Sequence, residues 1–314
     1  MADGSGFGLG ALRGEAPHAL RDNAAETVRG ILVVVLSYLA FTVGDVAGKW
    51  VLAAAGVSGV MIGRGLFGAA TVAGLAAAEG DWRRLLPVRR GRVALRSLLH
   101  GAVSMTWYVA WQQMTLADVY AIAFVMPLVM TLLAIPMLGE RLRWRRMVAT
   151  VVGFGGVLFM VRPGGELWTP ALVVLVPGII GTAVSRIMTR QLSTTETAEC
   201  LTFWLMVAHV PVGVLLLHHF PPGSALVWAV LAALVFLGVF NGIGHWLMAR
   251  AYALAPVSAL APYEYTMLIW GGLFGYAVFA EVPAWTTLAG AVVVAAAGLY
   301  NLYQERREAA WRGS

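Results

Sequence analysis

Apolar residues occur in long blocks along this chain, and short polar or basic segments separate the blocks. A helix needs about 20 residues to cross the hydrocarbon core of a bilayer, and most of the blocks are close to that length. The pattern therefore predicts ten membrane-spanning helices, at residues 30–52, 56–78, 93–115, 118–138, 144–161, 168–190, 198–217, 226–250, 257–280 and 285–304.

The composition points to the same class of protein. Hydrophobic residues make up 60% of the 314 residues and charged residues only 12%, with a mean hydropathy of +0.77. A soluble protein carries about 25% charged residues. We therefore predict an all-α polytopic membrane protein. The single cysteine, Cys200, excludes an internal disulfide bond.

The basic residues lie mainly at the ends of the predicted spans, so the net charge of +6 indicates membrane topology and not nucleic-acid binding. Arginines gather before the first span, at residues 83–92 and 141–146, and after residue 304. Positive residues mark the cytoplasmic side of a membrane. We therefore expect two cytoplasmic tails, residues 1–29 and 305–314. The even number of spans agrees, because it places both tails on the same side of the membrane.

Two stretches of the chain, residues 115–144 and 253–285, show the same order of features: a Leu-Ala turn, an apolar span, a glutamate and a tryptophan. Leu116 matches Leu254 at an offset of 138, and Glu140 matches Glu281 at an offset of 141. Each half then holds five spans, and an odd number inverts the second half. We predict a 5+5 inverted-topology repeat around a central cavity, an architecture typical of secondary carriers. The two glutamates are expected to be helix-end, packing or gate groups.

Residues 116–160 and 252–281 resemble the drug/metabolite transporter superfamily in its ten-helix EamA-domain form. The resemblance rests on the glutamate that closes spans four and nine and on the glycine-rich fifth span. It implies two EamA repeats, at residues 30–161 and 168–304, and transport by alternating access without ATP hydrolysis. The family includes amino-acid exporters, riboflavin importers and S-adenosylmethionine importers. This chain departs from the family pattern where Ala-Glu-Val-Pro replaces the usual Gly-Glu, at residues 280–283.

Polar residues interrupt the first span. On a helix, Tyr38, Thr42, Asp45 and Lys49 fall at positions i, i+4, i+7 and i+11 and form one stripe. A charged group in hydrocarbon costs about 2.5–3.5 kcal/mol on insertion scales, so the stripe must face protein or water. Asp45 and Lys49 can pair. Two interpretations remain open: the stripe lines a cavity or its gate, or it is structural, with either a static ion pair that locks the helix or Lys49 extending to the outer interface.

Four ionisable residues inside the spans are candidates for coupling or gating: Lys49, Arg64, Arg186 and Glu264. We expect Arg64 to contact Asp45 or a helix-end carbonyl, in a structural role. The repeat places Arg186 opposite Asp45. Glu264 either carries a coupling proton or pairs with Arg250 or Arg186.

Aromatic and hydrogen-bonding residues share faces of spans three, eight and nine. Such faces suit a ligand with an apolar body and a polar end, although ordinary helix packing is the alternative for any one residue. Together with the first-span stripe, they give the expected substrate cavity: Tyr38, Thr42, Asp45, Ser104, Trp107, Tyr108, Trp111, Asn241, His245 and Tyr265.

The sequence lacks the P-loop, HExxH and GxSxG motifs, so we expect no enzyme, no cofactor and no metal; a membrane enzyme, a channel or a scaffold are remote alternatives. We predict a multi-pass, monomeric secondary carrier in a bacterial inner membrane, either proton-coupled or uncoupled. Its substrate is a small amphipathic metabolite. Export of aromatic and other neutral amino acids is the first expectation, and import of riboflavin or S-adenosylmethionine is the alternative.

Overall fold

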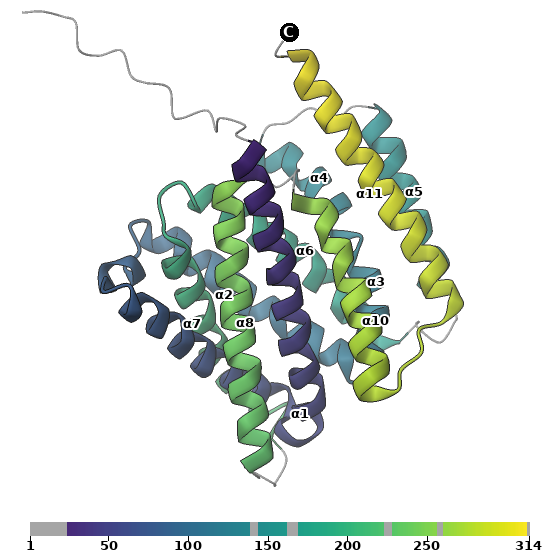
Figure 1. The fold of residues 1–314 in the computed structure, drawn as a ribbon. Coiled ribbons are helices and arrows are strands. Elements are labelled where there is room, and N and C mark those ends of the chain that lie inside the picture. The colour runs from purple at the N-terminus through teal and green to yellow at the C-terminus, as the bar shows by residue number, and fades with distance from the viewer. Residues whose placement is uncertain (1–23, 139–143, 162–168, 223–227, 256–259, 313–314) are drawn as a thin grey trace, which may run out of the picture.

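The computed structural model describes residues 24–138, 144–161, 169–222, 228–255 and 260–312 (Figure 1). These residues form helices and no strand. The α-helices are α1 (Ala24–Ala78), α2 (Arg90–Trp111), α3 (Leu116–Ala123), α4 (Met126–Leu138), α5 (Trp144–Val161), α6 (Pro170–Leu192), α7 (Ala198–Leu216), α8 (Trp228–Leu254), α10 (Thr266–Phe279) and α11 (Trp285–Arg312). Two short 3-10 helices are η1 (Trp82–Leu85) and η2 (Ala261–Tyr265).

Four helices of the described chain are long and apolar enough to cross a membrane: Val28–Ala78, Pro170–Leu192, Ala198–Leu216 and Trp228–Leu254. Shorter apolar helices cover Leu116–Met130, Val151–Met160 and Trp285–Tyr300. Together with the absence of strands from the described residues, these helices confirm the predicted class of all-α polytopic membrane protein. The number of membrane crossings stays a prediction.

The long helix α1 contains two predicted spans and one sharp break. The sequence predicts a link at residues 53–55, but these residues are helical and the break falls at Gly56, with φ of 63° and ψ of 170°. A Cβ atom at this position would lie 2.5 Å from the carbonyl oxygen of Pro221. Both the positive φ and the close approach require glycine, so Gly56 turns the chain back in a single residue.

The fourth and ninth predicted spans are not continuous helices. The fourth is divided into α3 and α4 by a turn at Phe124–Val125, next to Pro127, which lacks a backbone donor. In the ninth, η2 precedes α10. Because α4 begins at Met126 and α10 at Thr266, the two starts differ by 140 residues, in line with the offsets of 138 and 141 that define the repeat. Broken helices in membrane proteins are tolerated where they line a cavity.

The helix α1 packs against α7 and α8, α2 packs against α6 and α7, and α5 packs against α11. Figure 1 shows α5 and α11 side by side at one edge of the bundle, and the start of α1 and the end of α11 at the same end. Glycines permit the closest crossing: a Cβ at Gly238 would lie 2.4 Å from Cβ of Phe67, and one at Gly44 would lie 2.3 Å from Nδ2 of Asn241.

Candidate substrate cavity

A cavity lies between α1, α2, α6 and α8, with α3 and α10 contributing one residue each. Its space is about 740 Å³, counting the part open to solvent. The lining is aromatic and polar, and it contains charged groups of both signs. It consists of Phe41, Asp45, Arg64, Arg96, His100, Ser104, Trp107, Trp111, Tyr120, Thr182, Ser185, Arg186, Thr189, Asn241, His245, Met248, Ala249, Tyr252 and Met267.

Helices distant in the sequence bring many of the predicted site residues together at this cavity. Eight of them line it: Asp45, Arg64, Ser104, Trp107, Trp111, Arg186, Asn241 and His245. The other predicted residues either support the lining from behind or lie elsewhere, as described below. Their role in transport stays a prediction.

Asp45 is buried, with 7% of its surface exposed. The hydroxyl of Tyr120 donates a hydrogen bond to Asp45 Oδ2 at 2.9 Å. The amide of Asn241 faces the same carboxylate, but neither of its polar atoms makes a hydrogen bond of normal geometry within the described residues. Asp45 therefore presents a carboxylate to the cavity with one hydroxyl partner and no ion pair in the described chain.

The pairing of Asp45 with Lys49 is wrong. Lys49 forms an ion pair with Glu281 and donates to the carbonyl of Met114 at 2.9 Å. Glu281 in turn accepts from the backbone N–H of Leu116 at 3.0 Å. The i, i+4 spacing allowed the helix-internal pair, but the turn after α2 and the end of α10 offer Lys49 both a carbonyl and a carboxylate. We call Lys49, Glu281, Met114 and Leu116 the Lys49 cluster.

A related contact occurs at the position of the second repeat that corresponds to Lys49. Arg190 donates to the carbonyl of Tyr252 at 2.5 Å. The step from Lys49 to Arg190 is 141 residues and the step from Met114 to Tyr252 is 138, the same offsets that the sequence repeat shows. In each half, a basic residue on the first helix thus binds a carbonyl at or just after the end of the third. Glu140, the counterpart of Glu281, lies outside the described residues.

Arg64 does not contact its expected partners. Its guanidinium donates to the hydroxyl of Tyr108 and to Nε2 of His245, both at 2.9 Å. After the break at Gly56, α1 lies beside α7 and α8, since a Cβ at Gly65 would lie 2.8 Å from Val210 and one at Gly63 would lie 2.9 Å from Leu234. From this position the Arg64 side chain reaches α2 and α8. An arginine can only donate, so Nε2 of His245 is the acceptor and its proton resides on Nδ1. Tyr108 itself is fully buried behind the cavity.

Two further histidines join this group. The His100 ring lies 5.0 Å from that of His245 and 5.8 Å from that of His209. Ring nitrogens of His209 lie 3.1 Å from the hydroxyl of Ser104 and 2.7 Å from the carbonyl of Leu205. Sequence reasoning missed His100 and His209. The available signal for His100 was its position four residues before Ser104, on the same face of α2.

Arg186 pairs with Glu264 at 2.5 Å, and both side chains are largely buried. This is one of the two pairings expected for Glu264. The phenol of Tyr38 interacts with the same pair. Arg250, the other expected partner, instead lies 3.8 Å from Glu79, with its guanidinium 4.4 Å from the centre of the Trp246 ring.

Aromatic rings of α2 and α3 form one wall of the cavity. The Trp111 ring lies 6.5 Å from Trp107, 5.3 Å from Tyr108 and 6.4 Å from Tyr120. The indole N–H of Trp107 lies 3.4 Å from the hydroxyl of Thr182. The aromatic face predicted for span three therefore exists, and it faces α6.

Four residues predicted for the cavity are not part of its lining: Tyr38, Thr42, Tyr108 and Tyr265. Tyr265 does not line the cavity: its ring packs 4.9 Å from that of Phe124, and a Cβ at Gly298 would overlap its hydroxyl. Tyr265 is the last residue of the 3-10 helix η2. A 3-10 helix has three residues per turn, so the face predicted for span nine from 3.6 residues per turn does not apply there. Thr42 is fully buried and donates to the carbonyl of Tyr38 at 3.0 Å, behind the lining.

Comparisons with known proteins agree with this architecture. Residues 28–162 and 168–303 each match the EamA-like transporter family. An S-adenosylmethionine uptake transporter of Rickettsia bellii is 30% identical over 220 residues, which cover 68% of this chain and 72% of that protein. A riboflavin transporter of Brucella anthropi is 23% identical over 274 residues, covering 85% and 95%. A crystal structure with 16% identity superposes with a TM-score of 0.65 over 89% of this chain and 98% of the other, which shows the shared fold.

The helical bundle and these similarities define a membrane transporter of the drug/metabolite class. The chain belongs to the EamA-like transporter family and carries its domain twice.

Proposed function

We propose that the chain is a secondary carrier for a zwitterionic metabolite with an aromatic body, and that S-adenosylmethionine is its first candidate substrate. The observation that carries the proposal is the lining of the cavity, where Asp45 and three arginines are combined with tryptophan and tyrosine rings. An amino-acid group has a carboxylate, which guanidinium groups bind in a bidentate manner. Aromatic faces attract cations such as a sulfonium and stack on heterocycles.

The names of the relatives support one of the candidates that share this charge pattern. Relatives that are about 30% identical have the names S-adenosylmethionine uptake transporter and riboflavin transporter. The first name supports uptake of S-adenosylmethionine over export of free amino acids. Free amino acids, the first expectation from the sequence, are the second candidate because they have the same zwitterionic group. Riboflavin has neither an ammonium nor a carboxylate, so the three buried arginines favour it least.

In this proposal the Lys49 cluster closes one end of the cavity. It joins α1, the turn between α2 and α3, and the second residue after α10. Charged contacts between separate helices can form in one state of a carrier and break in the other, as alternating access requires. The corresponding contact of Arg190 joins α6 to α8 and is the counterpart in the second repeat.

The experiment is counterflow in proteoliposomes. Labelled S-adenosylmethionine is added outside vesicles loaded with unlabelled S-adenosylmethionine, a neutral aromatic amino acid, riboflavin or buffer. We expect the S-adenosylmethionine load to stimulate uptake, Asp45→Asn to lower that uptake at least about tenfold, and the exposed control Asp81→Asn to retain it. Parallel vesicles receive labelled amino acid or riboflavin. If only the labelled amino acid is exchanged, free amino acids replace S-adenosylmethionine as the first candidate substrate. If the folded protein exchanges none of the three labelled compounds, the proposal of a carrier for this class of substrate is contradicted.

A further inference from the structure

Polar atoms without partners concentrate at the cavity. Within the described residues, ten buried side-chain nitrogen and oxygen atoms have no hydrogen-bond partner. Six of the ten belong to residues that line the cavity: Arg64 Nε, His100 Nδ1, Trp111 Nε1, Ser185 Oγ, and both Oδ1 and Nδ2 of Asn241. Buried polar groups are satisfied in most folded proteins, and each exception requires an explanation. A bound molecule that supplies the missing partners explains why most of these exceptions share one cavity.

Five of the six atoms divide between two ends of the cavity. At one end, Trp111 stands beside Tyr120, which binds Asp45, and the Asn241 amide faces Asp45. We call these four residues the Asp45 pole: Asp45, Trp111, Tyr120 and Asn241. It presents a carboxylate, an amide and an indole N–H.

At the other end, Arg96 donates to the hydroxyl of Thr189 at 3.0 Å, and that hydroxyl binds the carbonyl of Ser185. His100 follows Arg96 by one turn of α2, and Arg186 follows Ser185. We call these four residues the arginine pole: Arg96, His100, Ser185 and Arg186. It presents two guanidinium groups, a hydroxyl and an imidazole nitrogen. Arg64 Nε, the sixth atom, belongs to neither pole.

The poles occupy different positions along the cavity. Their outermost residues on α2, Arg96 and Trp111, are separated by 15 residues, which corresponds to about 22 Å along the helix axis. Their inner residues are closer, because the His100 ring lies 5.0 Å from that of His245, one turn of α8 from Asn241. A free amino acid cannot occupy both poles. A molecule in which an amino acid is joined to a nucleoside can extend from one toward the other.

The chemistry of each pole selects a different part of such a molecule. The arginine pole offers donors to a carboxylate. The Asp45 pole combines acceptors with donors, and an asparagine amide pairs in a bidentate manner with the amino group and adjacent ring nitrogen of adenine. The amide of Asn241 is held against the backbone of Gly44, where a Cβ would lie 2.3 Å from its Nδ2. The backbone of α1 therefore closes this side of the amide.

We propose that the Asp45 pole recognises the polar edge of an aminopurine ring, while the arginine pole binds the carboxylate of the same molecule. This proposal rests on the proposed function and adds the selection of ligands by the two poles. Asn241 and Trp111 are then the residues that determine specificity for the ring, and Ser185 is the residue that responds to the carboxylate.

The test measures competition with labelled S-adenosylmethionine for the purified full-length protein. The competitors are S-adenosylhomocysteine, which has both parts, adenosine, which has the ring, and methionine, which has the amino acid. Three variants remove unpartnered groups: Trp111→Phe, Asn241→Leu and Ser185→Ala. The chain offers matched controls, because Trp270 and Ser97 also have a buried unpartnered polar atom but do not line the cavity. The controls are Trp270→Phe and Ser97→Ala.

We expect Trp111→Phe to lower the affinity for adenosine and for S-adenosylhomocysteine about fivefold, since one hydrogen bond to the ring is lost. The affinity for methionine should not change. Ser185→Ala should lower the affinity for methionine and for S-adenosylhomocysteine by a similar factor and leave the affinity for adenosine unchanged. Asn241→Leu should lower the affinity for adenosine at least about tenfold. Both control variants should change the affinity for each competitor less than twofold.

Equal effects of a variant on all three competitors, or effects of the controls as large as those of the variants, would overturn the assignment of the poles while leaving the carrier intact. Competition by methionine and none by adenosine would also overturn it. If the wild-type protein binds no S-adenosylmethionine, the proposed function fails, and the assignment of the poles fails with it.

Discussion

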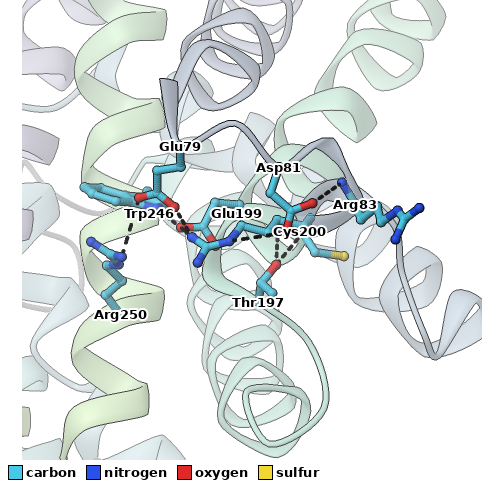
Figure 2. A network of polar contacts seen from close by, with 9 residues as sticks. Glu79, Asp81, Arg83, Thr197, Glu199, Cys200, Trp246 and Arg250 are labelled. Carbon is cyan, nitrogen blue, oxygen red and sulfur yellow. Dashed lines mark hydrogen bonds and ion pairs between the residues drawn. The ribbon is translucent and has the colours of Figure 1, made fainter. Parts of the chain in front are cut away.

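Polar side chains satisfy one another in one region of this protein and fail to do so in another. Figure 2 shows the first region, where the end of α1, η1, α7 and α8 meet. There, Arg84 contacts both Glu79 and Glu199, and the indole N–H of Trp246 donates to Glu199 at 2.8 Å. None of the residues drawn has a buried polar atom without a partner. In the substrate cavity, six such atoms lack one.

This difference separates polar groups that hold the fold from groups that are available to a ligand. A hydrogen bond inside the protein contributes about 1 kcal/mol, whereas an unsatisfied buried group costs about 1–3 kcal/mol. The cavity therefore carries a free-energy cost that the region in Figure 2 avoids. Substitutions in the two regions should consequently differ in kind, with stability affected in one and transport in the other.

The largest effect on stability is expected at the buried Arg186–Glu264 pair. Arg186→Met leaves Glu264 without its cation and should lower the stability by about 3–5 kcal/mol, measured by thermal unfolding in detergent. Replacing both residues, Arg186→Met with Glu264→Leu, should recover most of the stability but not transport, because the guanidinium also lines the cavity. Single and double variants of equal stability would contradict the buried pairing.

The next effect is on transport. Trp107→Ala should lower uptake at least about tenfold, because the indole forms part of the aromatic wall and aromatic stacking contributes about 0.5–1.5 kcal/mol beyond the buried area. The control is Trp228→Ala, a tryptophan that is 84% exposed, which should stay within twofold at equal expression. Equal losses of uptake in the two variants would contradict the proposal that this cavity binds the substrate.

A smaller effect is expected at the Lys49 cluster, whose two charged side chains are 11% and 18% exposed. Lys49→Met should destabilise the protein by about 1–2 kcal/mol. This is less than for a fully buried pair, because solvent screens part of the interaction. The charge exchange Lys49→Glu with Glu281→Lys should restore part of this loss, as a double-mutant cycle measures. If the exchange is no better than Lys49→Glu alone, the ion pair does not join these helices in the membrane.

The smallest effect is expected in the region of Figure 2. Glu79 is half-exposed and pairs with Arg84 and Arg250. Because exposed ion pairs contribute about 0–1 kcal/mol, Glu79→Gln should change the unfolding temperature little and uptake less than twofold. A loss of transport comparable to that of Trp107→Ala would show that this region also takes part in the transport cycle.

The sequence predicts the fold well where hydrophobicity decides the structure. Long apolar blocks give the helices, and the offset between Leu116 and Leu254 corresponds to the offset between the starts of α4 and α10. Local breaks are predicted less well. Gly56 breaks α1 because of its approach to Pro221, a tertiary contact that no pattern along the chain reveals.

The site was predictable as a set of helix faces but not as a set of contacts. Faces of spans one, three and eight predict Asp45, Trp111 and Asn241 at one cavity, and the structure places all three in the lining; their role in transport stays a prediction. Partners were not predictable, because long side chains such as Lys49 reach helix ends that are remote in sequence. A helical period also fails in a 3-10 segment, which is why Tyr265 was placed on the wrong face.

The most direct test of the central claim is protection of the cavity by its ligand. Ala249 lines the cavity and is 3% exposed, whereas Ala53 is exposed on α1. Each is changed to cysteine in a Cys200→Ser background, and the rate of alkylation by a small maleimide is measured with and without S-adenosylmethionine. We predict that the compound slows alkylation of Ala249→Cys and leaves Ala53→Cys unchanged. Equal rates with and without it at both positions, with folded protein, would contradict binding in this cavity.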